Sequence, residues 1–300
     1  MRDYYYYGAA NIPIAIVGFI INCLALYCLW KSNRGLELSN ANRFLLALNL
    51  WDTFTCLVLI PSKCMYYMTT RYFDEQPKIF KYTGAINTYC SSFLITLIAF
   101  NRYLAVSRPF RHQTILTKER VSILLASALG VGLLIPTMVF TRLRAFGTLT
   151  FIVAILILCT ILVLYCLILK EVNDSHKVVR SFRRNEERIP RRQARISFNV
   201  VILLTAYITC LGCFYGFLLN HVGKRFSSQS QSHIDIGILI FNMNSICNPV
   251  IYVLRSSSYR RVLKSLFGCR RHRIGMRNRV RRNRIAVLEQ PQPVPVVRVR

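Results

Sequence analysis

One carboxylate, Asp52, lies deep inside a long apolar run of the sequence. A buried charge of this kind is costly in hydrocarbon unless polar partners compensate it. Asn244, Asn248 and Tyr252, in the last apolar run, are spaced at i, i+4 and i+8 and therefore share one face of a helix. Together with Ser91, these groups could form an oxygen-lined site for a small hard cation or for ordered water. Alternatively, they hydrogen-bond neighbouring helices and hold a bundle together, and both interpretations can hold at once.

The elements that would position these residues are long and apolar. Hydrophobic residues make up 53% of the 300 residues, and charged residues make up 17%, below the roughly 25% of soluble proteins. Runs of about 20 apolar residues match the thickness of a bilayer core. We therefore expect an all-α membrane protein and exclude soluble enzymes, secreted disulfide scaffolds and disordered chains. The seven expected spans cover about residues 11–31, 41–67, 80–107, 120–141, 148–172, 194–221 and 232–254.

The spans divide the chain into a bundle and its flanking segments. Residues 11–254 form the predicted seven-transmembrane helix bundle, and residues 1–10 precede it as an extracellular N-terminus. The third span is the least hydrophobic, so we expect it in the middle of the bundle rather than against lipid. Residues 255–268 have the pattern of a short amphipathic eighth helix on the membrane surface. The tail, 269–300, is basic and then proline-rich, and is predicted to be disordered.

Basic residues are concentrated on one side of the predicted membrane. The chain carries 40 Lys and Arg and a net charge of +28, and 31 of these 40 residues lie in segments 31–43, 102–120, 170–195 and 255–300. An excess of Lys and Arg marks the cytoplasmic side, so the N-terminus is predicted to be extracellular. The distribution argues against nucleic acid as a partner and favours contact of the tail with anionic lipids of the inner leaflet.

Ten of the 11 cysteines fall in or at the edges of the apolar spans, where they act as small buried hydrophobic residues. No spacing among them suits a metal site. Cys269 directly follows the amphipathic segment and is a candidate palmitoylation site. The five histidines, including His112, lie in loops and helix ends and are predicted to be solvated.

Two motifs resemble those of rhodopsin-like (class A) G-protein-coupled receptors, and the resemblance covers about residues 11–270. Residues 244–252, NSICNPVIY, are similar to the NSxxNPxxY run that ends the seventh helix of that family. Residues 101–109, NRYLAVSRP, look like its DRY box and the proline that follows. Asn22, and Asn42 ten residues before Asp52, support the match. NPxxY alone is a weak motif, whereas all of these in order on seven spans are specific.

The resemblance implies roles for individual residues. The family's sodium pocket is matched by Asp52, Ser91, Asn244, Ser245 and Asn248, so a structural sodium ion is the only cofactor expected. The activation switch and G-protein-coupling set is matched by Asn101, Arg102, Tyr103, Tyr165, Pro249 and Tyr252. The implied function is to pass an extracellular ligand signal to a heterotrimeric G protein at the plasma membrane. An enzyme is not expected, because the spans contain no nucleophile–base pair.

The chain also departs from the family pattern. Asn101 replaces the acid of the DRY box, so Arg102 lacks a carboxylate neighbour and raised basal activity is expected. Tyr207, Leu211 and Cys213 stand at the phenylalanine, tryptophan and proline of the family's FxxCWxP switch in the sixth helix. The fifth-helix proline and the third-helix cysteine of the family are also replaced. These departures concern ligand-triggered switching and not the fold.

The chemical class of the ligand can be narrowed by excluding classes whose contact residues this chain lacks. Gly84 occupies the aspartate position of amine receptors and Asn242 the lysine position of opsins, which disfavours monoamines and retinal. A very short second outer loop adds a resemblance to the melanocortin, lysophospholipid and cannabinoid receptor cluster. The basic outer side favours an anionic or lipid-like ligand, with Lys78, Lys81, Arg142 and Arg144 as candidate contacts; ordinary solvated loop charge is the alternative. The outer basic residues also include Lys63, Arg71, Lys224 and Arg225.

Two other classes of function stay open at this point. A receptor-like protein that does not signal and acts as a partner or chaperone in a heteromer would suit the replaced switch residues. A transporter or channel would suit the span count and Asp52. Arginine clusters at 271–273 and 279–284 resemble endoplasmic-reticulum retention signals of the RxR kind, so retention is an alternative to surface delivery.

Overall fold

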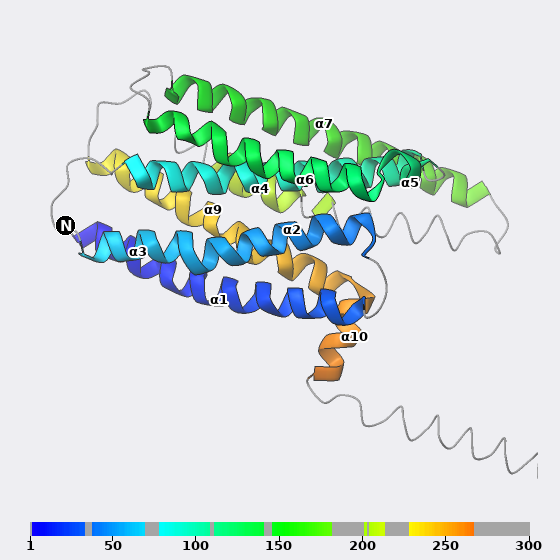
Figure 1. Ribbon diagram of the computed structural model, residues 1–300, viewed down its shortest axis with the longest axis horizontal. Helices are drawn as coiled ribbons and strands as arrows, with labels where there is room; N and C mark the ends of the chain where they lie inside the picture. The colour runs from blue at the N-terminus through cyan, green and yellow to red at the C-terminus, as the bar shows by residue number, and fades with distance from the viewer. Residues whose placement is uncertain are drawn as a thin grey trace, which may run out of the picture.

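The computed structural model of the chain is helical throughout its described elements (Figure 1). It describes residues 2–33, 38–69, 78–108, 111–140, 146–181, 201–202, 204–213 and 228–266, with some side chains inside these ranges left out. The predicted tail with Cys269 lies outside the described residues, as do Arg142 and Arg144. Lys78 and Lys81 belong to a described helix, but their side chains are not described.

Six helical segments within the described ranges are long and apolar enough to cross a membrane. A shorter apolar helix, Leu204–Cys213, lies within the predicted sixth span, so each of the seven predicted spans contains a helix. The long helices are α1 (Arg2–Ser32), α2 (Asn40–Phe54) continued by α3 (Ile60–Thr69), α4 (Lys78–Ser107), α6 (Lys118–Leu134), α7 (Phe146–Ser181) and α9 (Ser228–Arg255).

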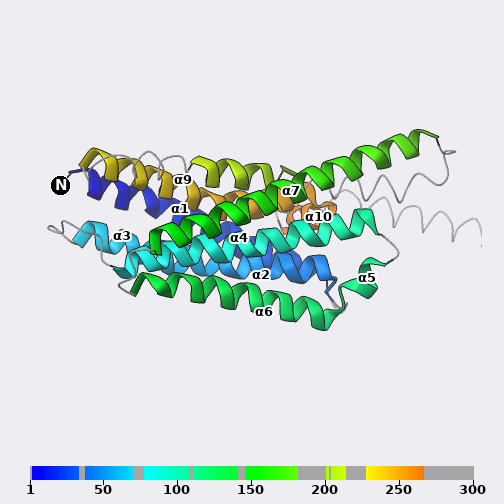
Figure 2. The same ribbon diagram turned by 90° about the horizontal axis from the view of Figure 1, so that it is seen from above.

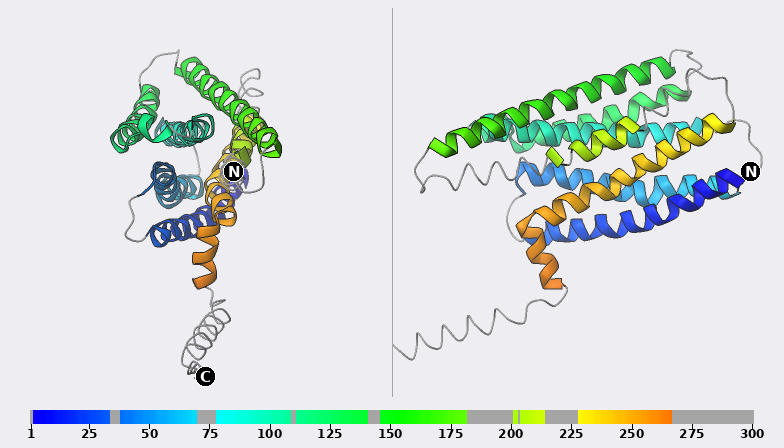
Figure 3. Two further views of the ribbon diagram at one scale, coloured as in Figure 1. Left: turned by 90° about the vertical axis from the view of Figure 1, so that its right-hand side faces the viewer. Right: turned by 180° about the vertical axis from the view of Figure 1, so that it is seen from behind.

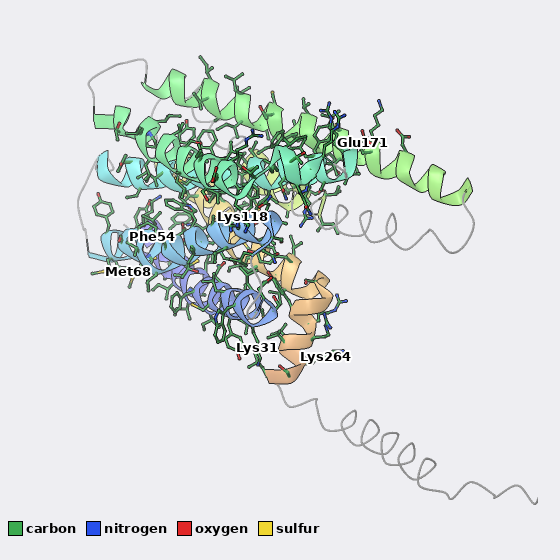
Figure 4. The ribbon with its side chains drawn as sticks, turned by 45° about the vertical axis from the view of Figure 1, so that its right-hand side comes forward. Lys31, Phe54, Met68, Lys118, Glu171 and Lys264 are labelled. Atoms are coloured by element: carbon green, nitrogen blue, oxygen red, sulfur yellow. The ribbon has the colours of Figure 1, made fainter. Side chains whose placement is uncertain are left out.

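The long helices run side by side along one axis, and α10 (Ser257–Leu266) turns away from the bundle at one end (Figures 1 and 3). We call this end, which also carries the single turn α5 (His112–Ile115), the α10 end (Figure 2). The opposite end, where α1 begins and α3 ends, is called the N-terminal end. Figure 4 shows Lys31 and Lys264 towards the α10 end and Met68 towards the N-terminal end.

The third predicted span, α4, lies in the middle of the bundle, as its polar residues predicted. It packs against α2, α6 and α7. In its most apolar stretch 61% of the residues are buried, against 17% for α6 and 22% for α7. The outer faces of α6 and α7 are exposed and apolar, and match a lipid environment. They include Ile123, Val131, Leu134, Leu156 and Val163.

The second span contains a π-helical turn at Thr55–Leu59 that the sequence analysis did not predict. Pro61 lies two residues after the turn and has no backbone N–H, so a continuous α-helix would lose a hydrogen bond there. The turn holds one extra residue, which rotates the faces of α3 by about 100° relative to an unbroken helix. The turn therefore decides which side chains of α3 point into the bundle.

Several helix ends differ from the predicted boundaries. The first helix starts at Arg2 instead of about residue 11, so residues 2–10 of the predicted N-terminal segment are helical. The fifth ends at Ser181 instead of residue 172, because residues 173–181 contain no Gly or Pro to stop the helix. The fourth ends in a 3-10 helix, Ile135–Phe140. The predicted amphipathic helix is confirmed as α10, whose Tyr259 and Val262 are buried while Lys264 is exposed.

Candidate functional site

Asp52 is completely buried and receives a hydrogen bond from α9, the helix of the seventh predicted span. The Nδ2 of Asn248, on α9, donates to Asp52 Oδ2 over 3.0 Å. The pair is reinforced from α1, where Asn22 Nδ2 donates to the carbonyl oxygens of Ser245 at 2.8 Å and of Gly18 at 2.9 Å. These contacts bring α1, α2 and α9 together around one carboxylate.

The same cluster contains buried oxygen atoms that accept no hydrogen bond. Among the described residues, Asp52 Oδ1, Asn22 Oδ1, Asn244 Oδ1 and Asn248 Oδ1 are all buried and without a hydrogen-bond partner. Unsatisfied buried acceptors indicate a bound ion or ordered water. Amide and carboxylate oxygens suit a hard cation. Within the described part of the chain no group of three or more His, Cys, Asp or Glu side chains could hold a metal ion, and the orphaned acceptors here are one carboxylate oxygen and three amide oxygens.

Ser91 lies at the level of Asp52 on the facing helix α4. One turn along α4, Asn87 Oδ1 accepts hydrogen bonds from Thr55 Oγ1 at 2.9 Å and from Trp51 Nε1 at 3.3 Å. Because α2 and α4 run in opposite directions (Figure 1), these contacts set Ser91 opposite Asp52. Ser91 is 1% exposed. All five residues predicted for the sodium pocket are buried, and the hydrogen bond from Asn248 to Asp52 joins two of them.

Tyr252 is tied to the same cluster by a residue that the sequence analysis missed. Its hydroxyl donates to Asn49 Oδ1 over 2.8 Å, and Asn49 Nδ2 donates to the carbonyl of Leu45 at 2.9 Å. Asn49 lies three residues before Asp52 and so shares its helix face, a spacing that could have identified it. Pro249 is buried within α9, which continues through it to Arg255.

The switch region of the sixth helix is joined to α4 by two hydroxyl groups. Tyr207 is fully buried, and its hydroxyl contacts Ser92 Oγ. Ser92 Oγ donates its own proton to the carbonyl of Thr88 at 2.6 Å, so Tyr207 must be the donor to Ser92. The ring of Phe241 meets Tyr207 edge-on, with centroids 6.3 Å apart. Leu211 is buried as well, whereas Cys213 is exposed.

At the α10 end, Asn101 is bonded to His112 of α5. His112 Nε2 donates to Asn101 Oδ1 over 2.9 Å. The sequence pattern predicted solvated histidines, whereas the ring of His112 is half-buried. Burial, and the nearby positive charge of Arg102, lower the pKa of His112 from its usual 6.5. Asn40 donates to the carbonyl of Leu116 and fixes the other end of α5.

Arg102 makes no hydrogen bond to the two tyrosines of the predicted activation set. Its Nε is buried without a hydrogen-bond partner among the described residues. No hydrogen bond within the described ranges joins it to Tyr165 or Tyr252, and Tyr252 bonds Asn49 instead. Tyr165 and Tyr103 are half-buried against the apolar core. The structure thus joins Asp52 to Asn248 of the predicted sodium pocket and leaves Arg102 apart from the two tyrosines.

The chain is similar to known membrane receptors over most of its length. Residues 21–148 and 141–252 match the 7 transmembrane receptor (rhodopsin family). Galanin receptor 2a of Danio rerio is 25% identical over 95% of this chain and 82% of its own length. The human (Homo sapiens) neuropeptides B/W receptor type 1 is 26% identical over 86% of this chain and 85% of its length. Melanocortin receptor 5 of Mus musculus, from the cluster that the sequence resembled, is 22% identical over 74% and 69%.

The family match covers most of the seven predicted spans and includes Asp52, Arg102 and the NPxxY-like run. Members of this family are receptors embedded in the membrane by several helices, and they are not enzymes. The chain therefore belongs to the rhodopsin family of seven-transmembrane receptors.

Proposed function

We propose that this receptor passes an extracellular ligand signal to a heterotrimeric G protein at the plasma membrane, and that it does so with raised activity in the absence of ligand. The α10 end is the cytoplasmic end in this proposal, because the basic segments 31–43, 102–120 and 255–300 adjoin it. The N-terminal end then faces the ligand.

The observation that carries the proposal is the hydrogen bond between Asn101 and His112. A carboxylate at position 101 would hold Arg102 by a charge-assisted hydrogen bond of about 1.5–3 kcal/mol. The neutral amide is instead engaged by α5, and Arg102 Nε has no hydrogen-bond partner among the described residues. Losing even about 1.4 kcal/mol of restraint on the inactive state shifts the inactive-to-active ratio about tenfold.

The test measures ligand-free nucleotide exchange by G proteins in membranes from cells that express the full chain. Asn101→Asp should lower the exchange rate several-fold relative to the wild type, and the neutral variant Asn101→Gln should not. Unchanged or faster exchange in Asn101→Asp contradicts raised basal activity. A wild-type rate equal to that of control membranes, despite surface labelling, favours the alternative of a non-signalling partner in a heteromer.

Sodium is the ion that we propose for the cluster around Asp52. Asp52, Ser91, Asn244, Ser245 and Asn248 would hold it. All five are buried, and the carboxylate and amide oxygens of Asp52, Asn244 and Asn248 include acceptors without a hydrogen-bond partner among the described residues. The bound ion would supply a positive charge that compensates the carboxylate. It would favour the arrangement in which α2 and α9 stay joined, and so the inactive state.

Anionic lipids of the inner leaflet are the proposed partners of α10 and the tail. Tyr259 and Val262 are buried on one face of α10, and Arg260, Arg261 and Lys264 are exposed on the other. A basic amphipathic helix next to a membrane gains about 1 kcal/mol per basic residue near an anionic surface. Palmitoylation of Cys269 would fix the start of the tail at the same surface.

A further inference from the structure

The side chain of Tyr259, on α10, is buried against the bundle with its hydroxyl group. It is 4% exposed and belongs to the same core as Cys28 of α1 and Tyr252 of α9. Its hydroxyl oxygen is buried and makes no hydrogen bond to any described residue. Burial raises the pKa of Tyr259 above its usual 10, so the hydroxyl keeps its proton at physiological pH. A buried hydroxyl donor without an acceptor is destabilising, so this group needs a partner.

The bend between α9 and α10 brings Tyr259 near Tyr252. Ser256 forms the bend: its backbone N–H donates to the carbonyl of Tyr252 at 2.9 Å, and its Oγ accepts from the backbone N–H of Tyr259 at 3.5 Å, as an N-cap does. The helix α10 then packs against both α1 and α9 (Figure 3). The phenol groups of Tyr252 and Tyr259 lie near enough to interact electrostatically, and so do Tyr259 and the thiol of Cys28.

The hydroxyl of Tyr252 has the complementary property. It donates its proton to Asn49 Oδ1 over 2.8 Å, and its oxygen keeps lone pairs that can accept a hydrogen bond. No described residue donates to that oxygen. Tyr259 is thus a buried donor without an acceptor, and Tyr252 is an acceptor without a donor in the same core. Buried polar groups of this kind are the usual partners of an ordered water molecule.

We propose that the hydroxyl of Tyr259 donates to an ordered water molecule that in turn donates to the hydroxyl oxygen of Tyr252, and that this link makes Tyr259 a positioning residue for Tyr252. The inference rests on the proposed receptor function. The second proton of the water faces the thiol of Cys28, a weak acceptor. Through Asn49 the link joins α10 to α2 as well as to α9. It holds Tyr252 on Asn49 and so favours the inactive state.

The first test uses the sign of a stability change. Tyr259→Phe removes the hydroxyl and keeps the ring in the core. Loss of the water link should lower the melting temperature of the purified full-length receptor in nanodiscs by about 2 °C. A hydroxyl that is buried without any partner gives the opposite sign, because its removal relieves an unsatisfied donor. An unchanged or raised melting temperature in Tyr259→Phe therefore overturns the proposal.

A double-mutant cycle tests whether the two tyrosines act together. In Tyr252→Phe the water has lost its acceptor, so the further loss caused by Tyr259→Phe should shrink to less than half. Val262→Ala is the control from the same helix, since Val262 is buried and has no polar side-chain atom. Its loss should add to that of Tyr252→Phe. Equal additivity for Tyr259→Phe and Val262→Ala contradicts the link.

Ligand-free nucleotide exchange separates positioning from packing. Tyr259→Phe should raise the exchange rate of the signalling receptor about 3-fold, because Tyr252 is held less firmly on Asn49. Val262→Ala should lower the melting temperature without this rise, and an equal rise in both variants overturns the positioning role. The melting temperatures involve no G protein. Coupled melting temperatures in a receptor that activates no G protein therefore contradict the proposed function alone, whereas uncoupled ones in a signalling receptor contradict the link alone.

Discussion

The two sides of the central helix α4 are held together by different forces. The polar side, formed by α1, α2 and α9, joins its helices by hydrogen bonds between buried side chains, such as Asn248 to Asp52 and Tyr252 to Asn49. The apolar side, formed by α6, α7 and Leu204–Cys213, is mostly in contact with its surroundings: α6 has 17% and α7 22% of its most apolar stretch buried. The apolar side nevertheless contains one buried polar contact, between the hydroxyl groups of Ser92 and Tyr207.

This difference explains which parts of the family pattern the chain retains. On the polar side, side chains such as Asn248 and Tyr252 have directional partners, so a replacement there leaves a buried group unsatisfied. On the apolar side, leucine at 211 and isoleucine at 157 still pack into the core. Helices in lipid gain little from hydrophobic burial and associate by close packing instead. Packing should therefore dominate stability on the apolar side, and hydrogen bonding on the polar side.

Substitution of Gly132 should have the largest effect on stability. It tests whether close packing dominates stability on the apolar side. A Cβ at this position of α6 would lie 2.7 Å from Cys90 Sγ and 3.2 Å from the backbone N and Cα of Cys90. The backbone cannot yield cheaply, so Gly132→Ala should destabilise the receptor by about 1–3 kcal/mol. Gly130, in the same helix, has nothing within 4 Å; Gly130→Ala should be neutral or stabilising by up to about 1 kcal/mol. Equal melting temperatures for the two purified variants would contradict the close packing.

Asp52 tests the polar side. If sodium is present at ten times its Kd, it should stabilise the wild type by about 1.4 kcal/mol. The melting temperature should rise when sodium replaces choline at constant ionic strength, and ligand-free signalling should fall. Asp52→Asn keeps the shape, removes the charge and should abolish both responses. Gly130→Ala, outside the cluster, should respond as the wild type does. A sodium response that survives in Asp52→Asn would make the cluster purely structural.

The sequence predicted the spans and the burial of Asp52, because both depend on patterns that one chain displays by itself. Span length follows from the bilayer, and Asp52 stands out as an acid in an apolar run. The contacts of Ser92 and His112 could not be predicted in this way, because each depends on a partner from another helix or loop. The start of α1 and the end of α7 were missed because a helix can continue beyond its apolar run, and residues 173–181 contain no Gly or Pro to stop it.

Ser92 and Tyr207 test the exception on the apolar side, where two hydroxyl groups are joined by a hydrogen bond. Tyr207 donates to Ser92, and Ser92 donates to Thr88. Tyr207→Phe therefore leaves only an acceptor without its partner and should cost about 0.5–1.5 kcal/mol, whereas Ser92→Ala strands a buried hydroxyl donor and should cost about 1–3 kcal/mol. The double variant should regain part of that loss. Because the pair joins α4 to the sixth helix, ligand-free signalling should rise in both single variants. Purely additive losses would mean that the pair is not coupled.

His112 gives the smallest expected effect, which is a change in how the stability of the receptor depends on pH. Burial and the charge of Arg102 lower the pKa of His112 in the folded receptor below its usual 6.5. Between that lowered pKa and 6.5 the unfolded chain binds more protons, so stability rises with pH through this window and is complete above it. As the pH falls below 6.5, His112 binds a proton in the unfolded chain before it does so in the folded receptor, where the charge would lie beside Arg102. The free energy of unfolding therefore decreases.

The variant His112→Gln isolates this contribution. Glutamine can still donate a hydrogen bond to Asn101 Oδ1, but it does not titrate. The other titratable groups, including the remaining histidines, are the same in both proteins and cancel in the difference. The melting temperatures of wild type and variant should therefore run parallel above pH 6.5. On acidification the wild type should fall further than the variant. Parallel curves through the whole range would mean that His112 titrates as it does in water and that the Asn101 contact does not bury it.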